Sequence, residues 1–314
     1  MKALITGITG FAGRHLADFL SARKGVEVHG LSRTGDRSSK NIHACDVQDA
    51  AKVGKLILKI RPDRIYHLAA QSSVAYSWEH PKETFEQNLM GTLNVLDAAR
   101  RLPRAPRIQL AGSAQEYGIP PKNKKIIDEN VPMNPLSPYS VSKVSQDLMA
   151  CQYVLHYGMK IVRTRAFNHI GPGQAADFVT SSFARQVARI EAGLQRPEIF
   201  VGNLDSVRDY TDVRDMVRAY WYALEKGEEG EVYNIASGDG RTVREILDVY
   251  LKLSPAKIAV KVDPARVRAN DLPRLVGDSR KFRRRTGWAP RISLETSLND
   301  VLAFWREKTK HEKK

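Results

Sequence analysis

The residues Thr6-Gly7-Ile8-Thr9-Gly10-Phe11-Ala12-Gly13 follow a short apolar run and lead directly into an amphipathic helical pattern. Glycine lets a backbone turn tightly and approach a pyrophosphate, and the free N–H groups at the start of a helix favour negative charge. The spacing differs from the GxGxxG fingerprint, and a glycine-rich turn needed only for packing is the alternative. We therefore expect a loop that holds the phosphates of a dinucleotide, with contacts from Gly7, Thr9, Gly10, Phe11, Ala12 and Gly13.

The first half of the chain alternates short apolar runs with helical patterns. Strands are expected at 3–5, 26–31, 64–68, 107–111 and 160–165, and helices at 14–23, 51–60 and 85–100. Such alternation is typical of βαβ units and a parallel sheet. The pattern predicts an α/β fold: a Rossmann-type doubly wound parallel sheet with a smaller, mostly C-terminal α/β lobe that binds the substrate.

The pattern loosens after residue 165 into segments that carry glycine and proline, which indicates a second lobe. A helix at 213–225 and a strand at 231–235 return to the first unit. We expect residues 1–166 with about 205–236 to form an NADP(H)-binding Rossmann domain. Residues of about 167–204 with 237–306 then form a nucleotide-sugar-binding lobe, and 307–314 form a basic, disordered tail.

The chain is strongly basic, with 50 Lys and Arg against 35 Asp and Glu and a formal net charge of +15. Clustered basic residues neutralise phosphates, so a nucleic-acid partner has to be considered. The basic residues are scattered or in short runs, and we find no basic stripe interleaved with aromatic residues. The sequence predicts no nucleic-acid partner, and an anionic small substrate accounts for part of the charge.

Compartment and metal content follow from what the sequence lacks. No apolar run approaches the roughly 18 residues of a membrane helix, and no apolar signal core opens the chain. The two cysteines, Cys45 and Cys151, have no zinc-site spacing. We expect a cytoplasmic protein with no membrane partner and no metal.

The end of the second expected strand favours NADP(H). Sites that prefer NAD usually carry a carboxylate there, but this chain has Ser32 and Arg33. A guanidinium binds phosphate in a fork, which suits a 2′-phosphate, so NADP(H) is preferred and NAD(H) remains possible. A solvated Arg33 is the alternative. Asp46 and Val47 are expected at the end of a further strand, before the helix at 51–60, where they can accept from the adenine amino group.

Tyr139 and Lys143 are four residues apart, which puts both side chains on one face of a helix. An ammonium beside a phenol lowers the pKa of the phenol from about 10 toward neutrality, so that Tyr139 can act as acid or base. Ser113 follows the strand at 107–111, where its hydroxyl can bind the reacting carbonyl. Such residues are common on surfaces, and only their order after the glycine loop indicates a catalytic set.

These motifs, with Leu68-Ala69-Ala70-Gln71 and the segment 112–118, resemble the extended short-chain dehydrogenase/reductase family. Within it, the segments 165–174, 201–205 and 208–215 resemble the GDP-6-deoxy-D-lyxo-4-hexulose reductases, and the likeness reaches about Trp305. The resemblance implies that Leu68, Ala69 and Ala70 bind the cofactor together with Tyr139 and Lys143. It also implies a homodimer formed through a four-helix interface that includes the helix carrying Tyr139.

The same resemblance implies the substrate site of a GDP-linked deoxyhexose. Arg208 and Arg268 face the diphosphate, Asp271 accepts from the ribose, and Asn168 contacts the sugar or its diphosphate. In the family, Arg-Pro usually precedes the acidic residue, whereas this chain has Arg268-Ala269-Asn270-Asp271. The implied substrate contacts are Gln71, Ser113, Gln115, Asn168, Val179, Arg208, Arg268 and Asp271.

Position 115 bears on the reaction. In similar GDP-mannose 4,6-dehydratases a glutamate there acts as base, whereas Gln115 cannot take a proton, and Glu116 points elsewhere if the segment is extended. The reductases often carry an acid there too, so this difference weakens dehydration without proving reduction. We expect NADPH-dependent reduction of GDP-4-keto-6-deoxy-D-mannose to GDP-D-rhamnose. The alternatives are a nucleotide-sugar 4-epimerase, a 4,6-dehydratase, or a catalytically silent NADP(H)-binding sensor or scaffold.

Overall fold

The computed structural model describes residues 1–35, 39–121, 124–267 and 272–313. Its central feature is a parallel sheet in the order β10-β6-β5-β4-β1-β2-β3, so the predicted doubly wound sheet is confirmed. The strand order reverses at β1, which makes the carboxyl end of β1 the point where such sheets bind ligands. The strands are β1 (Lys2–Thr6), β2 (Glu27–Ser32), β3 (Ile42–Ala44), β4 (Arg64–His67), β5 (Arg107–Ser113), β6 (Ile161–Ala166) and β10 (Val232–Ile235).

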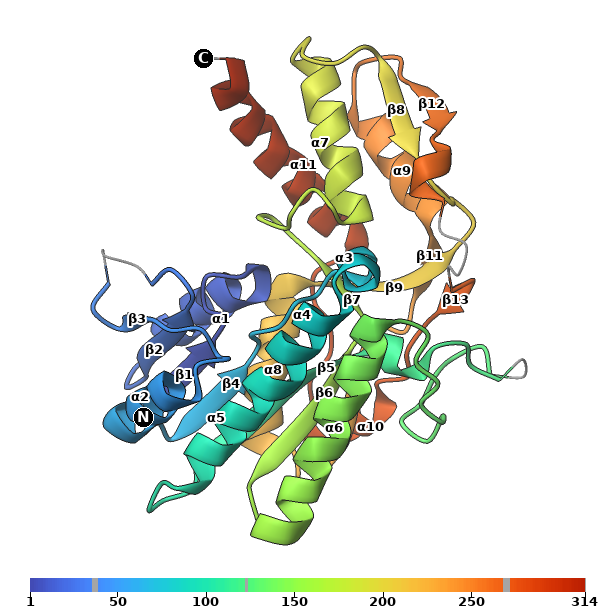
Figure 1. Cartoon of the computed structure of the whole chain (residues 1–314). Coiled ribbons are helices and arrows are strands. Elements are labelled where there is room, and N and C mark those ends of the chain that lie inside the picture. The colour runs from blue at the N-terminus through green and yellow to red at the C-terminus, as the bar shows by residue number, and fades with distance from the viewer. Residues whose placement is uncertain (36–38, 122–123, 268–271, 314) are drawn as a thin grey trace.

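Helices cover both faces of this sheet (Figure 1). Alternate residues of a strand point to opposite faces, and so Ala3 and Ile5 join one hydrophobic core while Leu4 joins the other. The first core is closed by α1 (Phe11–Ser21), α8 (Val213–Lys226) and α10 (Arg280–Thr286). The second is closed by α2 (Ala50–Ile60), α5 (Gly91–Arg100) and α6 (Pro138–Tyr157).

The helix expected at 85–100 is present, with a π-helical turn near its start, and two short helical segments precede it. The chain forms α3 (Val74–Glu79), α4 (Pro81–Phe85), a π-helical turn η1 (Glu86–Met90) and then α5. Asn88, in the π turn, is fully buried, accepts from Gln71 N at 2.7 Å and donates to the Ser142 hydroxyl at 2.8 Å. A π turn thus coincides with a buried side chain that ties the loop after β4 to α6.

The second lobe lies beyond the carboxyl edge of the sheet (Figure 1). It contains α7 (Val179–Glu191), β8 (Glu198–Val201), α9 (Val243–Leu253), β12 (Ala259–Val262) and α11 (Leu294–Lys310), around a core that includes Phe183, Tyr250 and Trp305. A small sheet joins the two parts, made of β7 (Asn168–Ile170), β9 (Val207–Asp212), β11 (Gly240–Thr242) and β13 (Arg274–Leu275). Short 3-10 turns are η2 (Ala114–Tyr117), η3 (Pro264–Arg266) and η4 (His311–Lys313).

The expectation of a disordered tail is wrong over most of its length. Helix α11 continues through Lys310, and η4 follows it. Trp305 and Thr309 are buried, and Glu312 forms an ion pair with Arg189 of α7. The basic residues that suggested disorder lie on a helix held by its apolar face. Among the described helices, none is long and apolar enough to cross a membrane.

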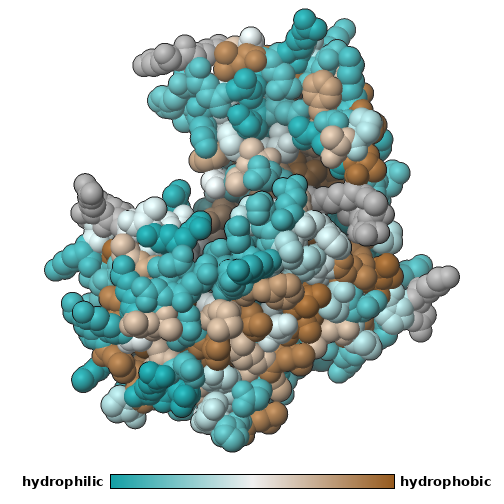
Figure 2. Space-filling view, viewed as in Figure 1, coloured by the Kyte–Doolittle hydropathy of each residue, from teal (hydrophilic) through white to brown (hydrophobic). Residues whose placement is uncertain are grey.

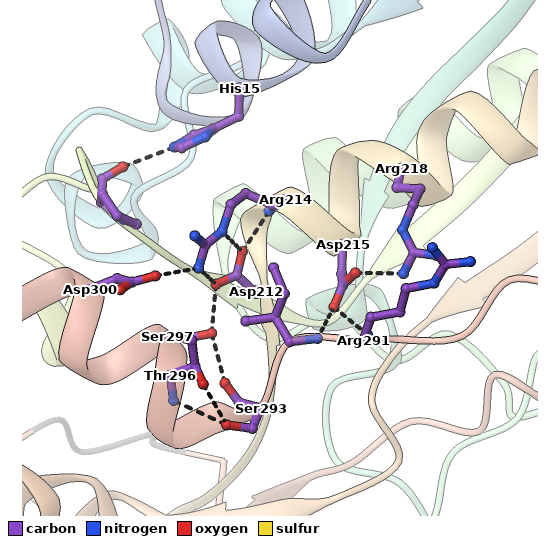
Figure 3. Close-up of polar contacts among 12 residues, drawn as sticks. His15, Asp212, Arg214, Asp215, Arg218, Arg291, Ser293, Thr296, Ser297 and Asp300 are labelled. Carbon is purple, nitrogen blue, oxygen red and sulfur yellow. Dashed lines mark hydrogen bonds and ion pairs between the residues drawn. The ribbon is translucent and has the colours of Figure 1, made fainter.

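Two carboxylates anchor the segment that leads into α11 (Figure 3). Asp212, the N-cap of α8, accepts from Arg214 and from the Ser297 hydroxyl at 2.6 Å. Asp215, one turn later, accepts from the backbone N–H groups of Arg291 at 2.6 Å and Ile292 at 2.8 Å. The acidic residues of the segment 208–215 therefore serve the connection between sheet and lobe.

We expect Asp215→Ala to lower the free energy of unfolding by about 3–5 kcal/mol, because it leaves two backbone N–H groups without their acceptor and removes the carboxylate partner of Arg218, whose side chain is only 12% exposed. The control is Asp300→Ala, since Asp300 and its partner Arg214 are 33% and 40% exposed. That change should cost less than about 1 kcal/mol. Urea unfolding measures both, and equal losses would contradict the anchoring role of Asp215.

Candidate active site

A cleft of about 1450 Å³ lies between the carboxyl edge of the sheet and the second lobe. Figure 2 shows the molecule hollowed between these two parts. Both the glycine loop and the expected catalytic residues open into this one space. The predicted site residues that line it are Gly7, Gly10, Phe11, Ala12, Gly13, Leu68, Ala70, Ser113, Gln115, Tyr139, Lys143, Asn168, Val179 and Arg208.

The glycine loop is shaped for an anion. Gly7 has φ +71°, and a Cβ on Gly13 would lie 2.1 Å from the Gly7 carbonyl oxygen, so neither position readily accepts a side chain. Helix α1 begins after Gly10, which gives no side-chain cap, and its first turn holds no acidic residue. The uncapped N–H groups and the helix dipole therefore fit the diphosphate of a dinucleotide.

The residues expected around the adenosine end lie near the ends of β2 and β3. The Ser32 hydroxyl is hydrogen-bonded to that of Thr9 at 2.9 Å, and Arg33 beside it is exposed. Asp46 Oδ1 accepts from Gln48 N at 2.9 Å. Val47 is buried, and its side chain lies so close to Gly91 that a Cβ there would come within 2.7 Å of it. The roles of these residues toward a cofactor stay predictions.

The remaining predicted contacts are Ala69, Gln71, Arg268 and Asp271. Ala69 N, like Leu68 N, donates to the Thr6 hydroxyl, so this loop is fixed by its backbone. Gln71 Nε2 donates to Ser73 O at 2.9 Å, and its Oε1 is buried without a hydrogen-bond partner among the described residues. Arg268 and Asp271 lie outside the described residues.

The predicted catalytic residues come from two elements. Pro138 at the first position of α6 and a capping box between Ser137 and Ser140 fix the start of this helix, which carries Tyr139 and Lys143. Ser113 is the last residue of β5, and its hydroxyl is hydrogen-bonded to Tyr139. Lys143 Nζ donates to the carbonyl of Ala111 at 2.9 Å. The three side chains are buried and border the same cleft.

The predicted fall in the pKa of Tyr139 is wrong for this structure. Burial raises the pKa of Tyr139 to about 12, against the hydrogen bond from Ser113, which lowers it. The Lys143 ammonium is directed at a carbonyl, and burial lowers the pKa of Lys143 to about 8. Tyr139 is therefore protonated at neutral pH, and Lys143 carries its charge below about pH 8.

In the sequence analysis the segment after Ser113 is treated as extended, but in the structure it is not. It forms the 3-10 turn η2, which leaves the Gln115 side chain at the cleft. Glu116 does point elsewhere, but because it turns inward: its side chain is fully buried, accepts from Ser113 N at 2.6 Å and pairs with Arg165 Nε at 2.9 Å. The residue facing the cleft at this point is thus an amide.

Sequence reasoning missed several residues around the site. Asn88 and Glu116 are polar residues next to the motifs, but neither lies on a periodic face that marks it as buried. Tyr220 of α8 lines the cleft, and its burial and the nearby Tyr139 raise its pKa. His169 stacks on Phe11 with parallel rings 5.8 Å apart. These contacts join elements far apart in the chain, and no local pattern predicts them.

Comparisons with known proteins agree with this geometry. Residues 4–301 match the family model described as GDP-mannose 4,6 dehydratase. The chain is 33% identical over 311 residues to GDP-6-deoxy-D-mannose reductase of Pseudomonas aeruginosa, covering 99% of each. It is 34% identical over 336 residues to GDP-mannose 4,6 dehydratase 2 of Arabidopsis thaliana, covering 99% of this chain and 88% of that protein. The solved structure of RMD from Pseudomonas aeruginosa complexed with NADPH superimposes with a TM-score of 0.89 at 31% identity, covering 98% of this chain and 99% of that one.

We expect Gly13→Ala to weaken NADPH binding at least about tenfold, because its Cβ would press on the carbonyls of Gly7 and Ile8 and displace the start of α1. The control is Gly54→Ala in α2, where a Cβ meets nothing within 4 Å. Titration of NADPH by fluorescence measures the dissociation constant of both variants. Unchanged binding by the Gly13 variant would show that the phosphates lie elsewhere.

Proposed function

Since the chain belongs to the GDP-mannose 4,6-dehydratase family of extended short-chain dehydrogenases/reductases, we propose that it reduces the 4-keto group of GDP-4-keto-6-deoxy-D-mannose with NADPH, giving GDP-D-rhamnose. The observation that carries the proposal is an active site with Ser113, Tyr139 and Lys143 together at the cleft but with Gln115 where a dehydratase needs its base. The full-length similarity to GDP-6-deoxy-D-mannose reductase supports it.

The residues of the cleft can supply the proton that the reduction requires. NADPH, when bound, supplies the hydride. Tyr139 gives its proton to the oxygen that becomes the alcohol, and Ser113 hydrogen-bonds the same oxygen. Reduction needs Tyr139 in its acid form, which a pKa of about 12 ensures at neutral pH. The Lys143 ammonium, at the same edge, favours the phenolate left after transfer.

The preference for NADPH rests on the end of β2. No carboxylate stands at Ser32 or Arg33 to repel a 2′-phosphate, and the exposed Arg33 is free to reach one. The solved RMD structure contains NADPH. NADH is the weaker cofactor on this proposal. Because an epimerase recycles a tightly held NAD, Ser32 and Arg33 also argue against that alternative.

The cleft has the groups that a nucleotide diphosphate-sugar requires. Arg208 is buried at the cleft wall, where a guanidinium suits a diphosphate. Asn168 and Val179 line the same cleft on the side of the second lobe. A 4,6-dehydratase is the second candidate because of the 34% identity to the Arabidopsis enzyme, and Gln115 is the residue against it.

The test follows NADPH absorbance as the protein meets GDP-4-keto-6-deoxymannose generated in situ. We expect oxidation of NADPH, slower turnover with NADH, and a loss of about 10²–10⁴-fold in kcat for Tyr139→Phe with unchanged NADPH binding. If the wild-type protein oxidises no NADPH, the reductase proposal fails. Dehydratase and epimerase activities on GDP- and UDP-sugars with NAD are then the ones to measure.

We also propose a homodimer that packs α5 and α6 against their copies. The outer face of α6 exposes Val141, Leu148 and Leu155, at 37%, 54% and 82%, and Met90 next to α5 is 45% exposed. Apolar side chains of this size on neighbouring helices are typical of a helical interface.

We expect Leu148→Glu to convert this dimer to a monomer, because a charge at the centre of an apolar contact remains unpaired. Multi-angle light scattering gives the mass. Leu58→Glu is the control, since Leu58 of α2 is 42% exposed and lies on another helix. A wild-type monomer, or a dimer that both variants keep, would contradict the interface.

A further inference from the structure

Behind the catalytic residues lies a group of buried charges that the proposed reaction does not use. Arg165 of β6 pairs with Glu116 at 2.9 Å and with Asp147 of α6 at 2.8 Å, and Arg163 contacts the same Asp147 oxygen at 3.1 Å. Arg165 also donates to the Tyr117 hydroxyl at 3.0 Å. Charges of this kind are costly to bury, so their place next to an active site calls for a functional explanation.

Glu116 is the member of this group that reaches the active site. Its Oε1 accepts from the backbone N–H of Ser113 at 2.6 Å, while the Ser113 hydroxyl accepts from Gln115 N at 3.2 Å. The two residues thus form a reciprocal capping box that fixes both the backbone and the side chain of Ser113.

The strand is shaped to admit this carboxylate. A Cβ on Gly112 would lie 2.5 Å from Glu116 Oε1, so only glycine at this position lets the side chain fold back against β5. The second oxygen approaches Arg165 as an ion pair without the direction of a hydrogen bond. Glu116 is therefore held by a hydrogen bond from Ser113 N and by its ion pair with Arg165.

We propose that Glu116 is a positioning residue of this active site: its buried carboxylate fixes Ser113 and supplies the negative charge that faces Lys143. The inference rests on the proposed reduction for its kinetic readout.

The charges around Glu116 indicate how it affects the protonation of Lys143. Burial and the neighbouring Asp147 raise the pKa of Glu116, against Arg165, which lowers it. Glu116 in turn raises the pKa of Lys143, against the burial that lowers it to about 8. The Arg165 guanidinium beside it favours the ionised carboxylate, and the negative charge of that carboxylate favours the protonated form of Lys143. The titratable or charged groups facing this pair are Arg165 from β6, Asp147 and Tyr139 from α6, His67 from β4 and Tyr117 from η2.

The test is Glu116→Gln, which keeps an acceptor for Ser113 N but loses the charge. We expect the Lys143 pKa and the alkaline limb of the kcat profile to move down by about 0.5–1 pH unit. NADPH affinity should stay within twofold of wild type. The Lys143 pKa is read directly by NMR of ¹³C-lysine-labelled protein, with Lys143→Met identifying the signal. That measurement needs no substrate, so it judges the inference even if the reductase assay fails.

Asp147→Asn is the matched control, because Asp147 contacts the same Arg165 but neither Ser113 nor, by its charge, Lys143. It should not lower the Lys143 pKa, because removing the Asp147 charge favours the ionised form of Glu116. An unmoved Lys143 pKa in Glu116→Gln, or an equal shift in both variants, overturns the proposal.

Glu116→Asp keeps the charge but is one methylene too short to reach both Ser113 and Arg165. We expect it to lower kcat by about 10- to 100-fold with the alkaline limb in place, because Ser113 is no longer fixed. This variant also tests the positioning role of Glu116 if Glu116→Gln does not fold. Unchanged kcat in Glu116→Asp would then count against the positioning role.

Discussion

The closest backbone contact in the cofactor loop constrains the rest of the structure. The carbonyl of Gly7 lies where a Cβ of Gly13 would be, so strand β1 and helix α1 meet with no side chain between them. This contact directs the uncapped start of α1 at the cleft, beside the point where the strand order reverses. All parallel strands end at the same edge, which brings Ser113 from β5 to the same cleft. The predicted dinucleotide loop and the predicted catalytic residues therefore meet at one edge of the sheet.

The parts predicted from the sequence are those that depend on local pattern. The glycine loop, the alternation of strands and helices and the spacing of Tyr139 and Lys143 are all visible in short windows. The π turn at Glu86–Met90 was not predictable, because it coincides with contacts of Asn88 to residues far along the chain. The pKa of Tyr139 was predicted in the wrong direction for a related reason. Spacing places an ammonium near a phenol, but only the fold shows that burial outweighs it and that the ammonium faces a carbonyl.

The acidic residues of the segment 208–215 have a structural role. Asp209 accepts from Ser237, Gly238 and Gly277, and Asp212 and Asp215 hold the ends of segments around α8. These carboxylates satisfy backbone N–H groups that no helix or strand uses. The acidic residues of the segment 208–215 therefore stabilise the connection between the sheet and the second lobe. Arg208, next to them in sequence, is left at the wall of the cleft, where its guanidinium suits a diphosphate.

Family membership does not choose between reduction and dehydration, because both use a tyrosine, a lysine and a hydroxyl at the same edge. A dehydratase needs, in addition, a base at the position that Gln115 occupies here. Of the two residues after Ala114, Gln115 lies at the cleft, and Glu116 has its carboxylate buried and paired with Arg165. A carboxylate so placed cannot take a proton from substrate, but it can hold Ser113 and balance the charge of Lys143. The position of this acid weakens the case for dehydration, and the full-length similarity to GDP-6-deoxy-D-mannose reductase supports reduction.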